Sequence, residues 1–224
     1  MNMTRNVLAG VVFSSLLLAG CVSKVTEQSQ YSGFLPSYDG LQEVTTPSGA
    51  TVLRWMAPGF TPGAYNTVVF KQLELYPAPA PSDRVDLKTL QDLQSYTSLS
   101  ARNTLSQKFL VVPNIKAAPA GARTLIMRVA ITGVSASNEG MKWYEVVPVA
   151  AVIGGVSAAT GHRNQDTELY LEADIVDARS GLPVMKVVRK VFGGVLKNSS
   201  QKITVNDFKV ALKGVTDDMT VLLK

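Results

Sequence analysis

The chain has 224 residues and a formal net charge of +5, with a single cysteine and a single histidine. One cysteine excludes an intramolecular disulfide, and one histidine excludes a metal centre built on several histidines. The positive charge is spread along the sequence, and its longest basic cluster, Lys186 to Lys190, includes two valines. Nucleic-acid binding requires a concentrated basic patch with aromatic platforms, so we expect no nucleic-acid partner.

The N-terminus has the pattern of a secretory signal. An apolar run follows Arg5 and ends at Leu18, which is shorter than the roughly 20 residues that a membrane-spanning helix needs. Its last four residues, Leu18-Ala19-Gly20-Cys21, resemble the lipobox of bacterial lipoproteins. The resemblance implies that residues 1–20 are a signal peptide, cut between Gly20 and Cys21. It also implies a diacylglyceryl group on the Cys21 sulfur and an acyl group on its amino nitrogen.

Lipidation of Cys21 would anchor the protein to a membrane, because each buried methylene adds about 0.8 kcal/mol and several chains share one residue. The next residue is Val22 rather than aspartate, which under the enterobacterial sorting rule implies the periplasmic side of the outer membrane. Other bacteria read Ser23 and Lys24, so inner-membrane anchoring stays open. Residues 21–32 are mostly small or polar and predict a flexible tether. The folded domain is therefore expected over residues 33–224.

A family resemblance begins directly after this tether. Ser32-Gly33-Phe34-Leu35, with Tyr38 and Leu41 close behind, resembles the start of the bacterial lipoproteins called domain of unknown function 3313. The resemblance continues through Arg54-Trp55 and would cover nearly all of the mature chain. It implies an envelope lipoprotein and carries no catalytic residues over to this sequence.

The body combines strand and helix periodicity. Strands are predicted over residues 67–76, 109–112 and 124–134, and a β-hairpin with a loop of five to seven residues over 168–192. Residues 86–105 predict a helix. A second helix follows Thr204, where Asp207 completes a capping pattern, and its apolar stripe lies at positions 205, 208, 212, 215, 219 and 222. We expect one α+β domain whose two main helices, the last included, pack on a mixed, mostly antiparallel sheet.

Residues with catalytic potential are few. His162 lacks partners with metal-ligand or triad spacing, and Gly155-Val156-Ser157-Ala158-Ala159 lacks the final glycine of a nucleophile elbow. Glu172 and Asp174 share one face of a predicted strand that also contains Glu168. Solvent exposure explains these carboxylates, and cross-strand pairing with Lys186 or Arg189 is an alternative. We therefore predict no catalytic residue, no metal site and no cofactor.

The nearly apolar segment 146–159 has two interpretations. It is a buried strand or loop, or it is an exposed loop that meets lipid or a partner subunit. The leading prediction is a lipid-anchored, non-enzymatic envelope protein that binds or scaffolds a partner. The alternative is an oligomeric component of an envelope transport or export assembly that self-associates through this segment. An enzyme is the third hypothesis.

Overall fold

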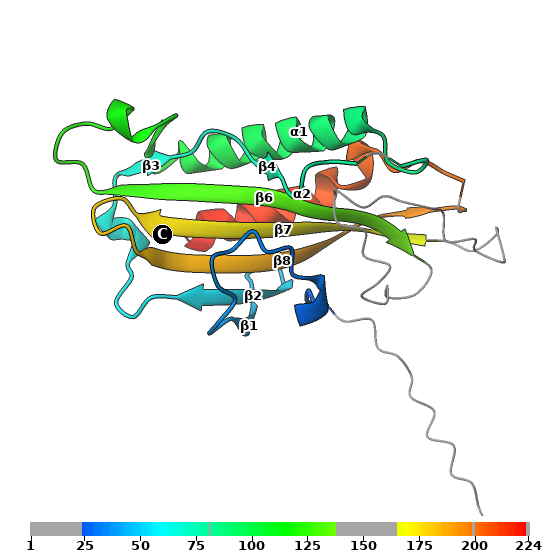
Figure 1. The fold of residues 1–224 in the computed structure, drawn as a ribbon, viewed down its shortest axis with the longest axis horizontal. Coiled ribbons are helices and arrows are strands. Elements are labelled where there is room, and N and C mark those ends of the chain that lie inside the picture. The colour runs from blue at the N-terminus through cyan, green and yellow to red at the C-terminus, as the bar shows by residue number, and fades with distance from the viewer. Residues whose placement is uncertain (1–23, 81, 138–164, 199, 223–224) are drawn as a thin grey trace, which may run out of the picture.

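The computed structural model describes residues 24–80, 82–137, 165–198 and 200–222. Its strands form one mixed sheet in the order β1-β2-β8-β7-β6-β3-β5, and β4 pairs separately with β6 (Figure 1). The strands are β1 (Gln42–Thr45), β2 (Thr51–Met56), β3 (Thr67–Val69), β4 (Glu74–Leu75), β5 (Leu110–Val112), β6 (Thr124–Ser137), β7 (Gln165–Asp177) and β8 (Pro183–Leu196). The helices are α1 (Leu87–Leu105) and α2 (Lys209–Leu222). The predicted α+β class, with a mostly antiparallel sheet and two main helices, is confirmed.

The centre of the sheet is the predicted hairpin. β7 and β8 pair antiparallel, and the loop of five residues between them closes on Asp177. The Asp177 carboxylate accepts hydrogen bonds from the backbone N–H groups of Arg179 and Ser180. Gly181 then adopts a φ of 70°, in the left-handed region that favours glycine. The hairpin turn is therefore determined by residues that are consecutive in the sequence, Asp177 to Gly181.

The predicted strand over residues 67–76 divides into β3 and β4. Between them, side chains of α1 form hydrogen bonds with backbone N–H and C=O groups. In a continuous strand, these backbone groups would have paired with neighbouring strands. Arg102 donates from Nη2 to the carbonyl oxygens of Phe70 and Lys71. Ser98 accepts from the N–H of Leu73, and Gln94 donates to the Leu73 carbonyl. The apolar pattern of this segment reflects burial of Phe70 and Leu73 beneath α1 rather than one long strand.

The two helices cover one face of the sheet and create the main core. Asp86 caps α1 by accepting from the N–H of Thr89, and Thr204 and Asp207 form the predicted capping box. The box first produces a short 3-10 turn, Val205–Asp207, and α2 follows it. All six positions of the predicted stripe belong to this core, and Phe208 and Leu212 are fully buried. The prediction that the last helix packs on the protein's own sheet is confirmed.

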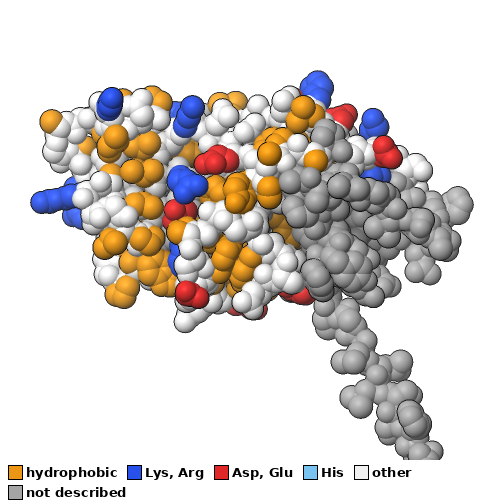
Figure 2. All heavy atoms as spheres, in the orientation of Figure 1, with side chains coloured by type: hydrophobic (Ala, Val, Ile, Leu, Met, Phe, Trp, Pro, Cys, Tyr) orange, Lys and Arg blue, Asp and Glu red, His pale blue; other side chains and the backbone are white. Residues whose placement is uncertain are grey.

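The opposite face of the sheet is covered by residues 24–41, which we call the N-terminal segment (blue in Figure 1). Phe34 and Leu35 pack with Leu53, Ala130 and Val188 in a second, smaller core. On this face, Lys and Arg side chains lie scattered among exposed hydrophobic groups (Figure 2). Helices of a length and hydrophobicity suited to crossing a bilayer do not occur within the described residues.

The packed body begins earlier than the predicted boundary at residue 33. Thr26 and Gln30 are buried, residues 28–30 form a 3-10 turn, and Val25 touches the second core. The polar composition that suggested a tether serves hydrogen bonding here: Gln30 Oε1 accepts from the N–H of Glu27. Both cores, as the described residues form them, lie within residues 25–222 and therefore after the predicted signal peptide.

Candidate functional site

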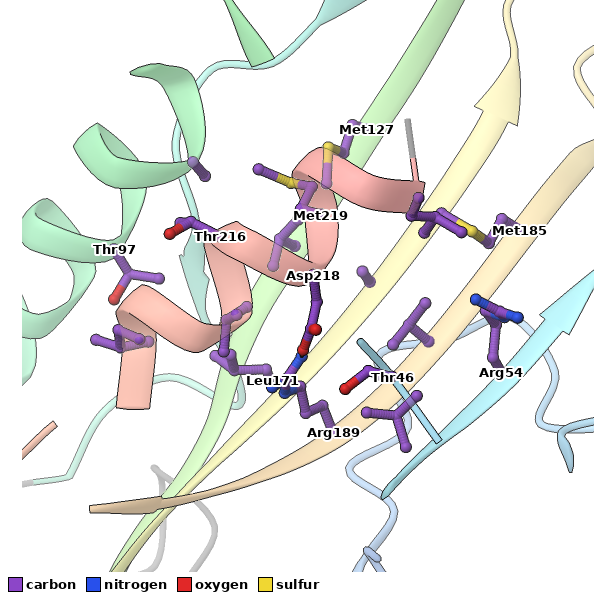
Figure 3. Close-up of a pocket in the computed structure, with 18 of the residues that line it drawn as sticks. Thr46, Arg54, Thr97, Met127, Leu171, Met185, Arg189, Thr216, Asp218 and Met219 are labelled. Atoms are coloured by element: carbon purple, nitrogen blue, oxygen red, sulfur yellow. The ribbon is translucent and has the colours of Figure 1, made fainter. Parts of the chain in front are cut away.

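The candidate site is a cavity of about 480 Å³ between α2 and the face of the sheet that α2 covers (Figure 3). Its floor comes from β2, β8, β7 and β6, its roof from α2, and its inner end from α1. Most of the lining is apolar, including Val52, Leu73, Met127, Val129, Leu171, Ala173, Ile175, Met185, Val187, Leu212, Val215, Met219 and Leu222. A volume of this size lies within the range of about 300–1,000 Å³ that is typical of small-molecule sites.

Short side chains under the second half of α2 leave this space open. The first half of the helix is held down by Phe208 and Leu212, which are fully buried. Beyond them, the central strands present Val129, Ala173 and Val187 to the helix, and these side chains are too short to fill the gap. The C-terminal half of the apolar stripe therefore forms the roof of a cavity, whereas the N-terminal half is close-packed core.

Three methionines gather at one end of the cavity. Met127, Met185 and Met219 come from β6, β8 and α2 and lie near one another in Figure 3. The same three residues also line a neighbouring cavity of about 30 Å³. Methionine is unbranched and adapts its shape to irregular spaces. This end of the cavity can therefore adjust to occupants of different length.

A buried ion pair forms part of the polar lining. Arg189 on β8 donates from Nη1 to Asp218 on α2 at 2.7 Å, and both side chains are less than a tenth exposed. Asp218 also accepts from the N–H and the hydroxyl of Ser48. Burial raises the pKa of Asp218, but the hydrogen bonds from Ser48 and Arg189 outweigh burial and lower its pKa below the ordinary value. The network ties the β1–β2 turn to both α2 and β8.

Arg54 is the second arginine in the lining. It is half-buried on β2, and within the described part of the chain its guanidinium has neither an ion pair nor a hydrogen bond. Arg54 is therefore a partly buried cation that has no counter-charge among the described residues and lies beside an apolar cavity. In the sequence, Arg54 stands out only as part of the Arg54-Trp55 family pattern. The available signal was its alternation with Val52 and Met56, which places a charge on an apolar strand face.

The predicted solvent exposure of the carboxylates on β7 is wrong. Glu168, Glu172 and Asp174 are each at most 3% exposed. The strand alternates as predicted, but its polar face is covered instead of solvated. Lys186 on β8 is opposite Asp174 in the register, as the cross-strand alternative required, whereas Arg189 points to the other face and pairs with Asp218.

These polar groups fasten the N-terminal segment to the sheet. Glu172 accepts hydrogen bonds from the N–H of Ser32 and from the hydroxyl of Tyr38. Lys186 donates to the carbonyl oxygens of Ser37 and Asp39. Burial, followed by the hydrogen bond to Glu172, raises the pKa of Tyr38 to about 12. The arrangement explains why a strand face covered by a chain segment keeps charged residues.

Two further carboxylates lie on this face. Glu168 accepts from the hydroxyl groups of Tyr170 and Ser135, and its carboxylate is 3.7 Å from Lys190 Nζ. Burial raises the pKa of Asp174, and Arg128 and Lys186 offset part of that rise. Each of these three carboxylates, the catalytic candidates on β7, thus has a hydroxyl or a cation close by, and they do not form a group open to solvent.

Several predicted features lie outside the described residues. They are Gly20 and Cys21, the segment 146–159, its Gly155–Ala159 portion, and His162, so the structure tests none of these predictions. Among the residues that the structure does describe, no three His, Cys, Asp or Glu side chains are grouped in a way that could hold a metal ion.

Comparisons with known proteins give a clear sequence match. A family model described as "Protein of unknown function (DUF3313)" matches residues 30–219. The protein called "Uncharacterized lipoprotein YdcL" from Escherichia coli K12 is 41% identical over 206 residues, which cover 92% of this chain and 90% of the relative. The protein of the same name from Escherichia coli O157:H7 matches to the same extent. The family match therefore includes most of the cavity lining and residues 30–41 of the N-terminal segment.

Solved structures give a weaker likeness. The PelC dodecamer from Paraburkholderia phytofirmans aligns with 77% of this chain and 96% of its own, at 14% sequence identity and a TM-score of 0.34. A likeness of this strength supports no argument about assembly, and the family assignment rests on the sequence match.

Proposed function

Because this chain belongs to the DUF3313 family and is a lipoprotein of that family, we propose that it is a non-enzymatic binding protein anchored to the outer membrane. Its ligand is a small molecule whose apolar part is held in the cavity between the sheet and α2. The cavity is the observation that carries this proposal: its volume is about 480 Å³ and most of its lining side chains are aliphatic or methionine. Empty cavities of this kind are costly to a fold, so a ligand that fills one stabilises the protein.

The packed body begins only a few residues after Cys21, and this short link supports a position of the body close to the membrane. Val25 touches the second core, and three residues lie between it and Cys21, so four Cα–Cα steps join the two positions. An extended chain spans at most about 3.6 Å per residue, so this link reaches roughly 14 Å. With lipid on Cys21, the body is held near the bilayer surface, where apolar molecules are concentrated. The longer tether expected from sequence would have allowed roughly three times that reach.

Blocking the cavity should abolish binding of an apolar ligand. Ala173 lies in the middle of the cavity floor, so Ala173→Phe places a ring in the open space. With residues 22–224 in solution, the neutral dye N-phenyl-1-naphthylamine is expected to fluoresce strongly when the cavity is free. In Ala173→Phe, we expect its affinity to fall at least tenfold, as measured by fluorescence titration.

The matched control is Ala78→Phe, which adds the same ring at an exposed loop position outside the cavity lining. This variant should bind the dye like the unchanged protein. Equal dye binding by all three proteins, with thermal melting showing that Ala173→Phe is folded, would rule out the cavity as the binding site.

The proposed anchor gives a separate prediction. Cys21→Ala should block lipid attachment, because the thiolate that accepts the diacylglyceryl group is absent, and the protein should remain as an unprocessed or mislocalised precursor. Cell fractionation and mass spectrometry of the N-terminus measure this outcome. Ser23→Ala, two residues further on, is the control that should leave processing intact. An unmodified thiol on the native protein would contradict lipid anchoring.

A further inference from the structure

Resting on the proposed function, we infer that the ligand is a single-chain amphiphile with an anionic head group. Its alkyl chain occupies the apolar part of the cavity, and Arg54, next to Arg189, binds the head group. The charges, strand register and volume of the cavity each support this assignment, and they do so independently of the family match.

The charge of the lining is unbalanced. Its charged residues are Arg54, Arg189 and Asp218. Asp218, the single carboxylate among the described lining residues, pairs with Arg189 and accepts from both donors of Ser48, and no ion pair joins it to Arg54. Within the described lining, one positive charge therefore has no counter-charge beside an apolar space. An arginine of this kind offers a planar fork of donors that suits carboxylates and phosphates.

The register of the sheet places the two arginines together. Arg54 on β2 is opposite Val187 on β8, so Arg189 is its diagonal neighbour on the same face. Such diagonal positions are about 7–8 Å apart between Cα atoms, within reach of two long side chains. The Nε atom of Arg189 is buried and has no hydrogen-bond partner among the described residues. An anionic oxygen between the arginines would satisfy this orphaned donor as well as Arg54.

The volume limits the apolar part of the ligand to one chain. At about 30 Å³ per water-sized group, 480 Å³ holds on the order of 16 such groups. One alkyl chain of medium length fits, and the two chains of a phospholipid do not. The methionines Met127, Met185 and Met219 at one end of the cavity accommodate differences in chain length.

Three ligands with the same alkyl chain test the assignment. Dodecanoate, dodecyl phosphate and dodecanol compete with N-phenyl-1-naphthylamine for residues 22–224, the two anions below their critical micelle concentrations and dodecanol below its solubility limit. We expect both anions to bind at least tenfold more tightly than the alcohol, since a hydrogen bond to a charged group contributes a factor of this order. The tighter of the two anions identifies the head group as a carboxylate or a phosphate.

Variants of Arg54 test whether this residue causes the preference for the anions over the alcohol. Arg54→Gln should reduce anion affinity about tenfold and leave dodecanol affinity unchanged, whereas Arg54→Lys should retain part of the preference. The control Arg179→Gln removes an exposed arginine from the β7–β8 loop and should change nothing.

The two proposals fail in different ways. If the dye binds but the anions and the alcohol compete equally, or if Arg54→Gln keeps the full anion preference, the head-group assignment is overturned while the cavity remains a binding site. Failure of the dye to bind at all overturns the proposed function itself.

Discussion

Replacement of Phe208 by alanine is expected to destabilise the protein by about 3–5 kcal/mol, the usual cost of removing a fully buried aromatic ring. Phe208 is fully buried and anchors the start of α2. Its ring lies so close to Gly193 on β8 that a Cβ atom on that glycine would come within 2.7 Å of Phe208 Cδ1. Gly193 has no side chain that could fill the space left by the ring.

Thermal unfolding measures this effect. For a domain of this size, the loss corresponds to a fall in Tm on the order of 10 °C. The matched control is Val210→Ala on the same helix, where the side chain is 87% exposed and little change is expected. An unchanged Tm for Phe208→Ala would mean that the apolar stripe of α2 does not hold the helix to the sheet.

Replacement of Asp218 by alanine should have a comparable effect for a different reason. The substitution leaves Arg189 as a buried cation without a counter-charge and removes the acceptor used by Ser48. Breaking a buried pair in this way typically costs about 3–5 kcal/mol, because the remaining charge is still desolvated. Chemical denaturation followed by circular dichroism measures the change.

The adjacent residue provides the control for Asp218. Asp217 pairs with Lys213 on the same helix, but both side chains are more than half exposed. Exposed pairs of this kind contribute little because water screens them. Asp217→Ala should therefore leave stability nearly unchanged. Similar losses for both variants would show that helix charge in general, rather than the buried pair, is responsible.

The Asp218 contact also has a pH signature. Its pKa in the folded protein is below the ordinary value, so the unfolded state binds more protons in the interval between the folded and unfolded pKa values. The stability that this contact contributes is complete above the unfolded pKa of about 3.9 and is lost as the pH falls through the lower folded pKa. The stability difference between the unchanged protein and Asp218→Ala should therefore be constant near pH 7 and shrink below about pH 4.

Phe208 and Asp218 hold α2 to the sheet, and other residues of the same helix line the cavity. Phe208 and Leu212 hold the first half of α2 in the core, and Asp218 ties the second half to β8 through Arg189. Val215, between these attachments, and Met219, directly after the second one, line the cavity instead of packing tightly. A helix fastened at two points can cover a cavity without collapsing into it.

The sequence by itself determined the features that depend on neighbouring residues. Asp86 and the Thr204–Asp207 box mark where the helices begin, the Asp177–Gly181 turn fixes the hairpin, and the stripe from 205 to 222 identifies the buried side of the last helix. The opening from Ser32 to Leu35 was sufficient to indicate the family. Each of these signals is contained within one turn or one face of one element.

Only the tertiary structure decided what depends on distant residues. The alternation on β7 separates polar from apolar faces, but whether the polar face meets water depends on Ser32 and Tyr38, more than 130 positions away from Glu172. The break between β3 and β4 depends on donors from α1. The cavity and the unpaired Arg54 depend on how far α2 stands from the strands, which is set by packing at Phe208 and by the Asp218–Arg189 pair. Periodicity specifies which way a side chain points, and the fold specifies what it meets there.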